Sequence, residues 1–292
     1  MELARKSRPK ARTLLAETWQ RLCKNKAAMA GLIFVIIITL LALFADVVAD
    51  YGTKVIQTHP LERLQRPSLQ HPFGTDDMGR DLFARVVHGA RYSLAFGIVC
   101  TLAAMAIGGA LGAAAAFFGG AVEAVIMFIA DTISCIPGTL LSLSLMAVLG
   151  PGLKNLMIAI TFGGIPIFTR IIRSIVLGIV RQEYIEAARA AGVSNLRTIF
   201  LHVLPNAIGL IIVNFTMNVA GRIMAASALS YIGMGIQPPA PEWGAMLTDA
   251  LKFLRTDPHV VIFPGMAIVI TALSFNLLGD GLSEALDPRL RD

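Results

Sequence analysis

The sequence predicts an all-α membrane protein with six transmembrane helices. Of its 292 residues, 55% are hydrophobic and only 15% are charged, which is more apolar than an average soluble domain. A bilayer core about 30 Å thick needs roughly 20 apolar residues per helix, and several stretches reach that length with few or no charges. The six predicted spans cover residues 27–45, 92–122, 124–149, 155–179, 206–229 and 260–278.

The first two spans contain no charged residue. Residues 27–45 are too long for the apolar core of a signal peptide and no small-residue cleavage site follows them, so we expect them to remain as an anchor. Residues 92–122 allow a tilted helix and a tight turn at Gly119 and Gly120. Small residues recur every four positions in this second span, which favours close packing within a bundle over a specific dimerisation face. These small residues are Ala104, Gly108, Gly112 and Ala116.

The third span contains a carboxylate, Asp131, and a proline, Pro137. A membrane helix tolerates proline where neighbouring groups satisfy the freed carbonyl, so we expect one continuous helix through Pro137. The segment Gly150-Pro151-Gly152 then predicts a turn into the fourth span.

Ionisable side chains within spans are rare, because each costs roughly 2.5–3.5 kcal/mol at the bilayer centre on insertion scales. Asp131 near the middle of the third span and Arg222 in the fifth are interpreted either as part of a translocation pathway or as members of structural ion pairs. Asn214 and Asn218 precede Arg222 on the same helix, so the three form a polar stripe. Asp280 lies beside glycines at the end of the sixth span, where a helix-end contact is expected rather than substrate binding.

Basic residues concentrate before the first span and predict the orientation of the chain. They are Arg5, Lys6, Arg8, Lys10, Arg12, Arg21, Lys24 and Lys26. The positive-inside rule keeps this tail in the cytoplasm, and six spans return the C-terminus to the same side. The net charge of +6 therefore reflects topology and does not indicate nucleic-acid binding.

This topology divides the chain into five parts. The predicted parts are a basic cytoplasmic tail (1–26), the first transmembrane helix (27–49), an external loop with a surface helix (50–91), a five-helix core (92–281) with a cytoplasmic loop at 180–205 and an external loop at 233–259, and a cytoplasmic tail (282–292).

No pattern in the sequence indicates catalysis or a bound metal. The three cysteines are not placed to bridge an external loop, and the five histidines lack the spacing of a zinc site. Neither a phosphate-binding loop nor a nucleophile elbow is present, so any nucleotide that drives this protein binds to another subunit. A secondary transporter would need inverted repeats or several intramembrane acids, and an intramembrane enzyme a nucleophile–base pair; the sequence favours neither class.

The cytoplasmic loop carries an ordered, charged segment. Residues 182–191 favour a helix rich in alanine, and Gly192 suits a left-handed position after its last turn. Ser194 then caps a second helix that we expect to stop at Pro205, so that the pair forms a helix–turn–helix at the membrane surface. From the residues alone, a docking helix for a partner and an ordinary amphipathic connector remain equally open.

This loop resembles the cytoplasmic signature of ABC importer permeases, which reads E-A-A-x-x-x-G followed by L-P. The matching residues are Glu186, Ala187, Ala188, Gly192, Leu204 and Pro205. His202 departs from the usual aliphatic residue two places before the leucine. The segments 71–81, 89–94, 228–235, 237–244, 275–281 and 287–289 resemble the second permease of dipeptide and oligopeptide importers, so the resemblance covers nearly the whole chain.

The resemblance implies the type I ABC importer permease (MetI-like) fold and a non-catalytic role in a bacterial-type cytoplasmic (inner) membrane. The implied partners are a homologous second permease, two ABC ATPase subunits that bind ATP and Mg, and an external substrate-binding protein, all working across the lipid bilayer. The loop helix from Tyr184 to Gly192, including Arg189, would couple ATP hydrolysis to transport. Short peptides are the implied substrate, with a nickel complex, glutathione or haem as alternatives.

The external loop after the fifth span contains a predicted surface helix. Trp243, Leu247, Leu251 and Leu254 form one apolar face, and tryptophan commonly sits at the membrane interface. An interfacial anchor is favoured here over a gate or a dock for the binding protein.

Overall fold

The structure is a computed structural model that describes residues 14–286, and over that range it is built from helices and loops. The basic residues from Arg5 to Arg12 and the sequence segment 287–289 lie outside the described residues. The helices in chain order are α1 (Leu14–Lys24), α2 (Lys26–Leu43), α3 (Ala45–Val48), η1 (Tyr51–Ile56), η2 (Pro60–Glu62), α4 (Leu82–Phe118), α5 (Gly120–Ser134), α6 (Gly138–Leu149), α7 (Leu153–Val180), α8 (Glu183–Ala190), α9 (Asn195–Thr198), η3 (Ile199–Val203), α10 (Leu204–Tyr231), α11 (Trp243–Ala250), η4 (Leu251–Phe253) and α12 (His259–Leu286).

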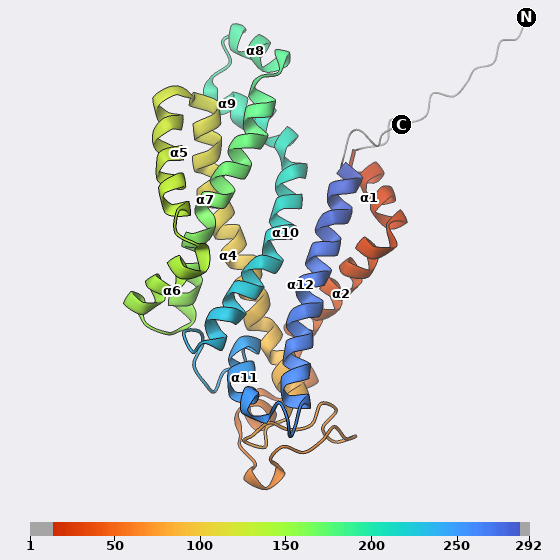
Figure 1. The fold of residues 1–292 in the computed structure, drawn as a ribbon. Helices are drawn as coiled ribbons and strands as arrows, with labels where there is room; N and C mark the ends of the chain where they lie inside the picture. Colours follow the sequence, from red (N-terminus) through yellow and green to blue (C-terminus); the bar gives the residue numbers. More distant parts are fainter. Residues whose placement is uncertain (1–13, 287–292) are drawn as a thin grey trace, which may run out of the picture.

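The predicted all-α membrane fold is confirmed. In the described chain, five helical segments are long and apolar enough to cross a membrane, and the bent pair α5 and α6 makes a sixth if it is counted as one span. The five segments are α2, α4, α7, η3 with α10, and α12. These long helices run along the length of the molecule side by side (Figure 1).

The third span is broken, so the expectation of one continuous helix through Pro137 is wrong. α5 ends at Ser134, α6 begins at Gly138, and the two helices are bent by 82°. Proline has no backbone N–H and disfavours helical geometry in the preceding residue, and here no helix bridges the gap. Asp131 consequently lies in the last turn of α5, directly before the break.

Helix α4 begins well before the predicted second span, at Leu82. The Asp81 side chain caps it by accepting a hydrogen bond from the Ala84 N–H at 2.8 Å. The helix has 37 residues and is therefore about 55 Å long, which exceeds the hydrocarbon core of a bilayer. Segment 82–91, assigned from sequence to the external loop, is thus helical.

The stripe of small residues on α4 packs against α7, as the sequence predicts. A Cβ atom on Gly108 would lie 2.4 Å from the Ile165 carbonyl oxygen, and one on Gly112 would lie 2.3 Å from that of Thr169. Both contacts are far closer than a side chain permits, so only glycine allows the two backbones to approach this closely.

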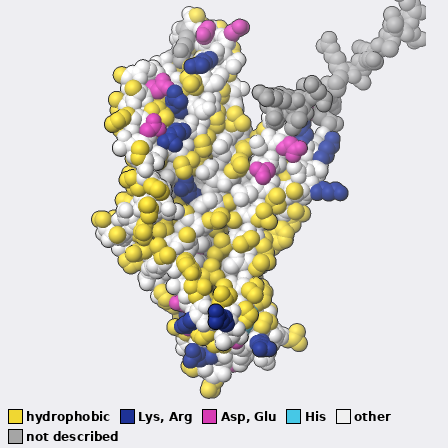
Figure 2. Space-filling model, viewed as in Figure 1, with side chains coloured by type: hydrophobic (Ala, Val, Ile, Leu, Met, Phe, Trp, Pro, Cys, Tyr) yellow, Lys and Arg dark blue, Asp and Glu magenta, His cyan; other side chains and the backbone are white. Residues whose placement is uncertain are grey.

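The bundle has two distinct ends. Figure 1 shows α8 at one end, where α1 also lies and α12 finishes, whereas the segment before α4 and helix α11 gather at the opposite end. We call these the α8 end and the α11 end. Hydrophobic side chains cover much of the face in Figure 2, and charged side chains collect toward its two ends. The order of the spans thus places the loop holding α8 and both ends of the described chain on one side.

Candidate functional site

Helix α8 is fixed to the bundle by one buried side chain. Ile185 is fully buried and packs in a cluster with Val203 and with Ile172 and Val176 of α7. Its neighbours Tyr184 and Glu186 are exposed. The helix is therefore held on one side and presents the other to solvent or to a partner.

The turn after α8 has the geometry predicted for Gly192. This glycine has φ +78°, and the N–H of Val193 donates to the Ala188 carbonyl at 3.1 Å, five residues back. This is the long hydrogen bond of a Schellman motif, with glycine in the left-handed position. A Cβ atom at Gly192 would meet nothing within 4 Å, so the backbone angle alone demands glycine.

The predicted stop at Pro205 is wrong, because the chain remains helical through it. Pro205 lies in the first turn of α10, and the preceding turn widens so that the Leu204 N–H donates to the Ile199 carbonyl five residues back. A proline ring clashes with the carbonyl four residues before it, and a wide turn relieves that clash. The second helix of the loop therefore leads directly into the fifth span.

The loop from α8 to the start of α10 exposes a group of large apolar side chains. Phe200 is 61% exposed, Leu201 57% and Tyr184 45%. We give the name coupling surface to seven of the exposed residues of this loop, which are Tyr184, Glu186, Ala187, Phe200, Leu201, Leu204 and Pro205. Ala188 and His202 are half-buried, and the Arg189 side chain lies outside the described residues. Exposed apolar groups beside charges suit a protein partner.

Arg222 of α10 lines an open cavity between α6, α7 and α10. The cavity has a volume of about 260 Å³ and is also lined by Thr139 and Ser142 of α6 and by Gly163 of α7. The guanidinium fills the space where Gly164 lacks a side chain, since Nη2 lies 2.7 Å from the position of a Cβ there. Within residues 14–286, no carboxylate lies within ion-pair distance of Arg222.

The other members of the polar stripe bond to their own helix. The side-chain amide of Asn214 donates to the backbone carbonyl of Leu210, and that of Asn218 donates to the backbone carbonyl of Asn214, both at 2.8 Å. Both side chains are half-buried. Each amide oxygen therefore remains available on the face that the two residues share with Arg222.

Asp131 is a member of an ion pair. Its Oδ1 accepts from Nε and Nη2 of Arg170 on α7, at 3.1 and 3.0 Å. A second bridge joins the same two helices, between Glu123 and Arg173. Of the two interpretations left open for Asp131, the structure favours the ion pair over the pathway.

Helix α11 is built into the bundle, so the favoured interpretation as an interfacial anchor is wrong. Trp243 is fully buried, and its indole N–H donates to the Val86 carbonyl of α4 at 2.9 Å. The Glu242 carboxylate is also fully buried and caps α11 by accepting from the N–H groups of Gly244 and Ala245. Gly244 in turn lies directly against the backbone of Ser227 in α10. α11 thus packs between the ends of the long helices.

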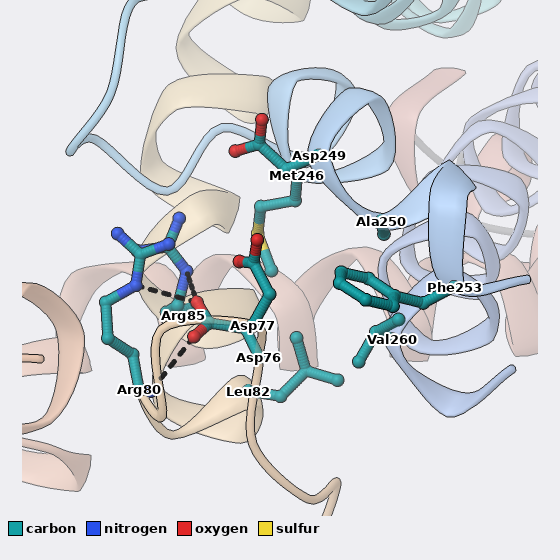
Figure 3. Close-up of a pocket in the computed structure, with 10 residues that line it drawn as sticks. All are labelled: Asp76, Asp77, Arg80, Leu82, Arg85, Met246, Asp249, Ala250, Phe253 and Val260. Carbon is teal, nitrogen blue, oxygen red and sulfur yellow. Dashed lines mark hydrogen bonds and ion pairs between the residues drawn. The ribbon is translucent and has the colours of Figure 1, made fainter. Parts of the chain in front are cut away.

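A buried charged cluster joins the loop before α4 to the first turn of α4 and lies opposite α11 (Figure 3). Asp76 accepts from Nε of Arg80 at 2.7 Å and lies 3.3 Å from Nε of Arg85. Asp249 lies across the same pocket, where burial and the neighbouring Asp77 carboxylate raise its pKa. The pocket has a volume of about 20 Å³, which is room for a single water molecule. The pocket is thus too small to bind a peptide, and the cluster links the loop to α4.

The described residues contain no group of three His, Cys, Asp or Glu side chains placed to hold a metal ion. The two candidate functional sites are therefore the coupling surface at the α8 end and the Arg222 cavity between α6, α7 and α10.

Comparison with known proteins agrees with this architecture. Residues 92–292 match the family described as binding-protein-dependent transport system inner membrane component, and residues 13–67 match the N-terminal TM domain of oligopeptide transport permease C. The chain is 42% identical over 275 residues to the dipeptide transport system permease protein DppC of Alkalihalophilus pseudofirmus, covering 94% of this chain and 90% of the relative. It is 42% identical over 281 residues to the glutathione transport system permease protein GsiD of Escherichia coli O157:H7, covering 96% and 92%.

Proposed function

The chain belongs to the family of binding-protein-dependent transport system inner membrane components, and we propose that it forms half of the translocation pathway of an ATP-driven importer of short peptides. The family consists of transport components, and this chain acts as a non-catalytic subunit. ATP and Mg bind to two ABC ATPase subunits, which dock on the α8 end. A homologous second permease supplies the other half of the pathway.

The coupling surface carries this proposal. α8 is set on the bundle through Ile185, which packs against Val203 of η3, and α8 ends at the left-handed Gly192. After this turn, α9 continues through η3 into α10 without a break in the helix. A push on α8 is therefore transmitted to a span that lines the Arg222 cavity. ATP shifts the pathway only if the ATPases bind it more tightly in one of two arrangements, and a docked helix links that preference to the permease.

The proposed orientation places the α8 end and both termini in the cytoplasm. Lys and Arg before the first span set this direction by the positive-inside rule. The α11 end then faces outward in a bacterial-type inner membrane, where the external binding protein delivers substrate. The loop tied to α4 through Asp76 and Arg85 lies at this end and is part of the surface proposed to meet that protein.

Short peptides are the proposed substrate, because a dipeptide permease aligns with nearly the whole chain. Glutathione is the second candidate, since permeases named for it align at the same identity. Both are small peptides with free carboxylates and amide groups, which a stripe of asparagine and arginine side chains can hydrogen-bond.

Co-expression of this chain with a second permease and two ATPase subunits tests the proposal. A stable complex is expected to hydrolyse ATP and, with the loaded binding protein, to take up a dipeptide into proteoliposomes. The purified chain alone is expected to neither bind nor hydrolyse ATP. Failure of the four subunits to co-purify would overturn the assignment.

A further inference from the structure

We propose that Arg222 binds the carboxylate of the passing substrate, in the open cavity lined by α6, α7 and α10. This inference rests on the proposed function and deepens it, because it assigns one chemical group of the substrate to one side chain of the pathway.

Arg222 has no ion-pair partner in the described part of the chain. An arginine within a span is costly and normally faces protein or water, paired with an acid or a carbonyl. The two other arginines within the neighbouring span have such partners, Arg170 with Asp131 and Arg173 with Glu123. Arg222 is half-buried, and in the described part of the chain no carboxylate reaches it. Its charge is thus left for a group that this subunit does not supply.

The cavity lined by Arg222 offers both space and polar groups to a substrate. Its volume is about 260 Å³, and the Thr139 and Ser142 side chains form part of its wall. Ser142 donates its hydroxyl proton to the Ala159 carbonyl at 3.2 Å. Its hydroxyl oxygen therefore remains free to accept, for instance from an N–H group of a peptide.

Gly164 makes room for the Arg222 guanidinium. The guanidinium lies against Gly164, where a Cβ would come within 2.7 Å of Nη2 and 2.8 Å of the Ala104 side chain. The absence of a side chain at Gly164 therefore leaves a slot between α4 and α7 in which the guanidinium lies. A guanidinium carries parallel pairs of N–H donors, which match a carboxylate better than a point charge would.

A double comparison tests the proposal in the complete complex with saturating binding protein. Uptake of a dipeptide with a free C-terminal carboxylate is compared with uptake of its C-terminal amide, in the wild type and in Arg222→Gln. Equilibrium dialysis first sets concentrations that load the binding protein fully with either form. The preference of the binding protein then cancels, because the same protein serves both complexes.

The carboxylate-to-amide uptake ratio is expected to fall about tenfold or more in Arg222→Gln, since a charged hydrogen bond is lost only for the carboxylate form. Arg170→Gln removes an arginine already paired with Asp131 and is expected to leave the ratio unchanged. If Arg222→Gln does not assemble, Arg222→Lys replaces it, with a smaller fall expected because lysine keeps the charge but loses the paired donors.

Equal loss of both peptide forms would overturn the proposal and give Arg222 a structural role, such as an ion pair with the sister permease. That outcome leaves the proposed function standing. If the wild-type complex takes up neither form although it hydrolyses ATP, the peptide substrate itself is refuted, and the inference falls with it.

Discussion

The backbone N–H of Val193 donates to the carbonyl of Ala188 at 3.1 Å, and this bond closes helix α8 around Gly192. The bond forms only because Gly192 adopts φ +78°, a left-handed angle that side chains with a Cβ branch strongly disfavour. The direction in which the chain leaves the coupling surface toward α10 is thus set at one residue.

Gly192→Val is expected to uncouple ATP hydrolysis from uptake while leaving the bundle assembled. The left-handed angle costs roughly 1–2 kcal/mol for an ordinary residue, and more for a β-branched one, so the turn should shift. A Cβ atom at this position meets nothing within 4 Å, so the effect is expected to come mainly from the backbone angle. Gly192→Asn is the control, because asparagine tolerates this angle and should retain most of the coupled uptake. Equal coupling in wild type and Gly192→Val would refute the role.

Glu186→Lys is expected to weaken coupling with almost no change in stability. The side chain is exposed, and exposed substitutions usually change the free energy of unfolding by about 0.5 kcal/mol or less. Glu183→Lys is the matched control, since both glutamates are exposed in the first turn of α8 and interact alike with the helix dipole. The measurement is peptide taken up per ATP hydrolysed. A similar loss in both variants would point to a general charge effect instead of a specific contact.

Hydropathy predicted the membrane spans because backbone groups in lipid must be satisfied within a helix, which demands long apolar segments. The left-handed Gly192 was also predictable, since its cause is local. The break at Pro137 was not, because the same proline bends one helix and ends another according to its neighbours. Hydropathy also placed the start of α4 too late, because Arg85 and His88 are buried against the loop that precedes the helix.

Contacts between distant residues explain the remaining differences. Trp243 looked like an interfacial residue, yet its partner Val86 lies 157 positions earlier in the chain. The ion pair of Glu123 could not be predicted from the sequence, because its partner Arg173 is 50 residues away. Glu242 did carry a local signal, since a negative charge is favourable at the N-terminus of a helix. Its complete burial, however, depends on packing between α10 and α11.

The Asp131 and Arg170 pair predicts rescue by charge exchange. Asp131→Arg alone should reduce assembly and uptake, because it places two positive charges together between α5 and α7. Combining it with Arg170→Asp restores opposite charges and should recover most of both. Since both side chains are about half exposed, the pair is worth roughly 1 kcal/mol or less to stability. If uptake stays low in a well-assembled double variant, Asp131 acts in the pathway after all.

Trp243→Phe is expected to destabilise the α11 end by about 1 kcal/mol through loss of its hydrogen bond to Val86, with a further cost for the smaller ring. Trp19→Phe is the control, because Trp19 is 54% exposed and its replacement should change little. The apparent Tm of the complex reports the difference, measured at one scan rate by a thiol-reactive probe for buried Cys100 in a background that lacks the exposed Cys23 and Cys135. An equal shift in both variants would contradict the buried, hydrogen-bonded position of Trp243.

Glu242→Gln is expected to gain stability relative to the wild type as the pH rises. Burial raises the pKa of Glu242 above its ordinary value of 4.5, against the opposing effect of the Gly244 and Ala245 N–H groups. The folded protein therefore holds this proton more tightly than the unfolded chain does, and the contribution of Glu242 to stability falls as the pH climbs from 4.5 through the raised pKa. Glutamine stays neutral and keeps one acceptor for the helix cap, so the Tm difference between variant and wild type should grow over that range.

Trp243 fluorescence in a Trp19→Phe background follows the unfolding of the α11 end. Glu242→Ala, which loses both cap acceptors, should melt below Glu242→Gln at every pH. A Tm difference that stays constant or shrinks with rising pH would show that the carboxyl group is not held in its protonated form by burial.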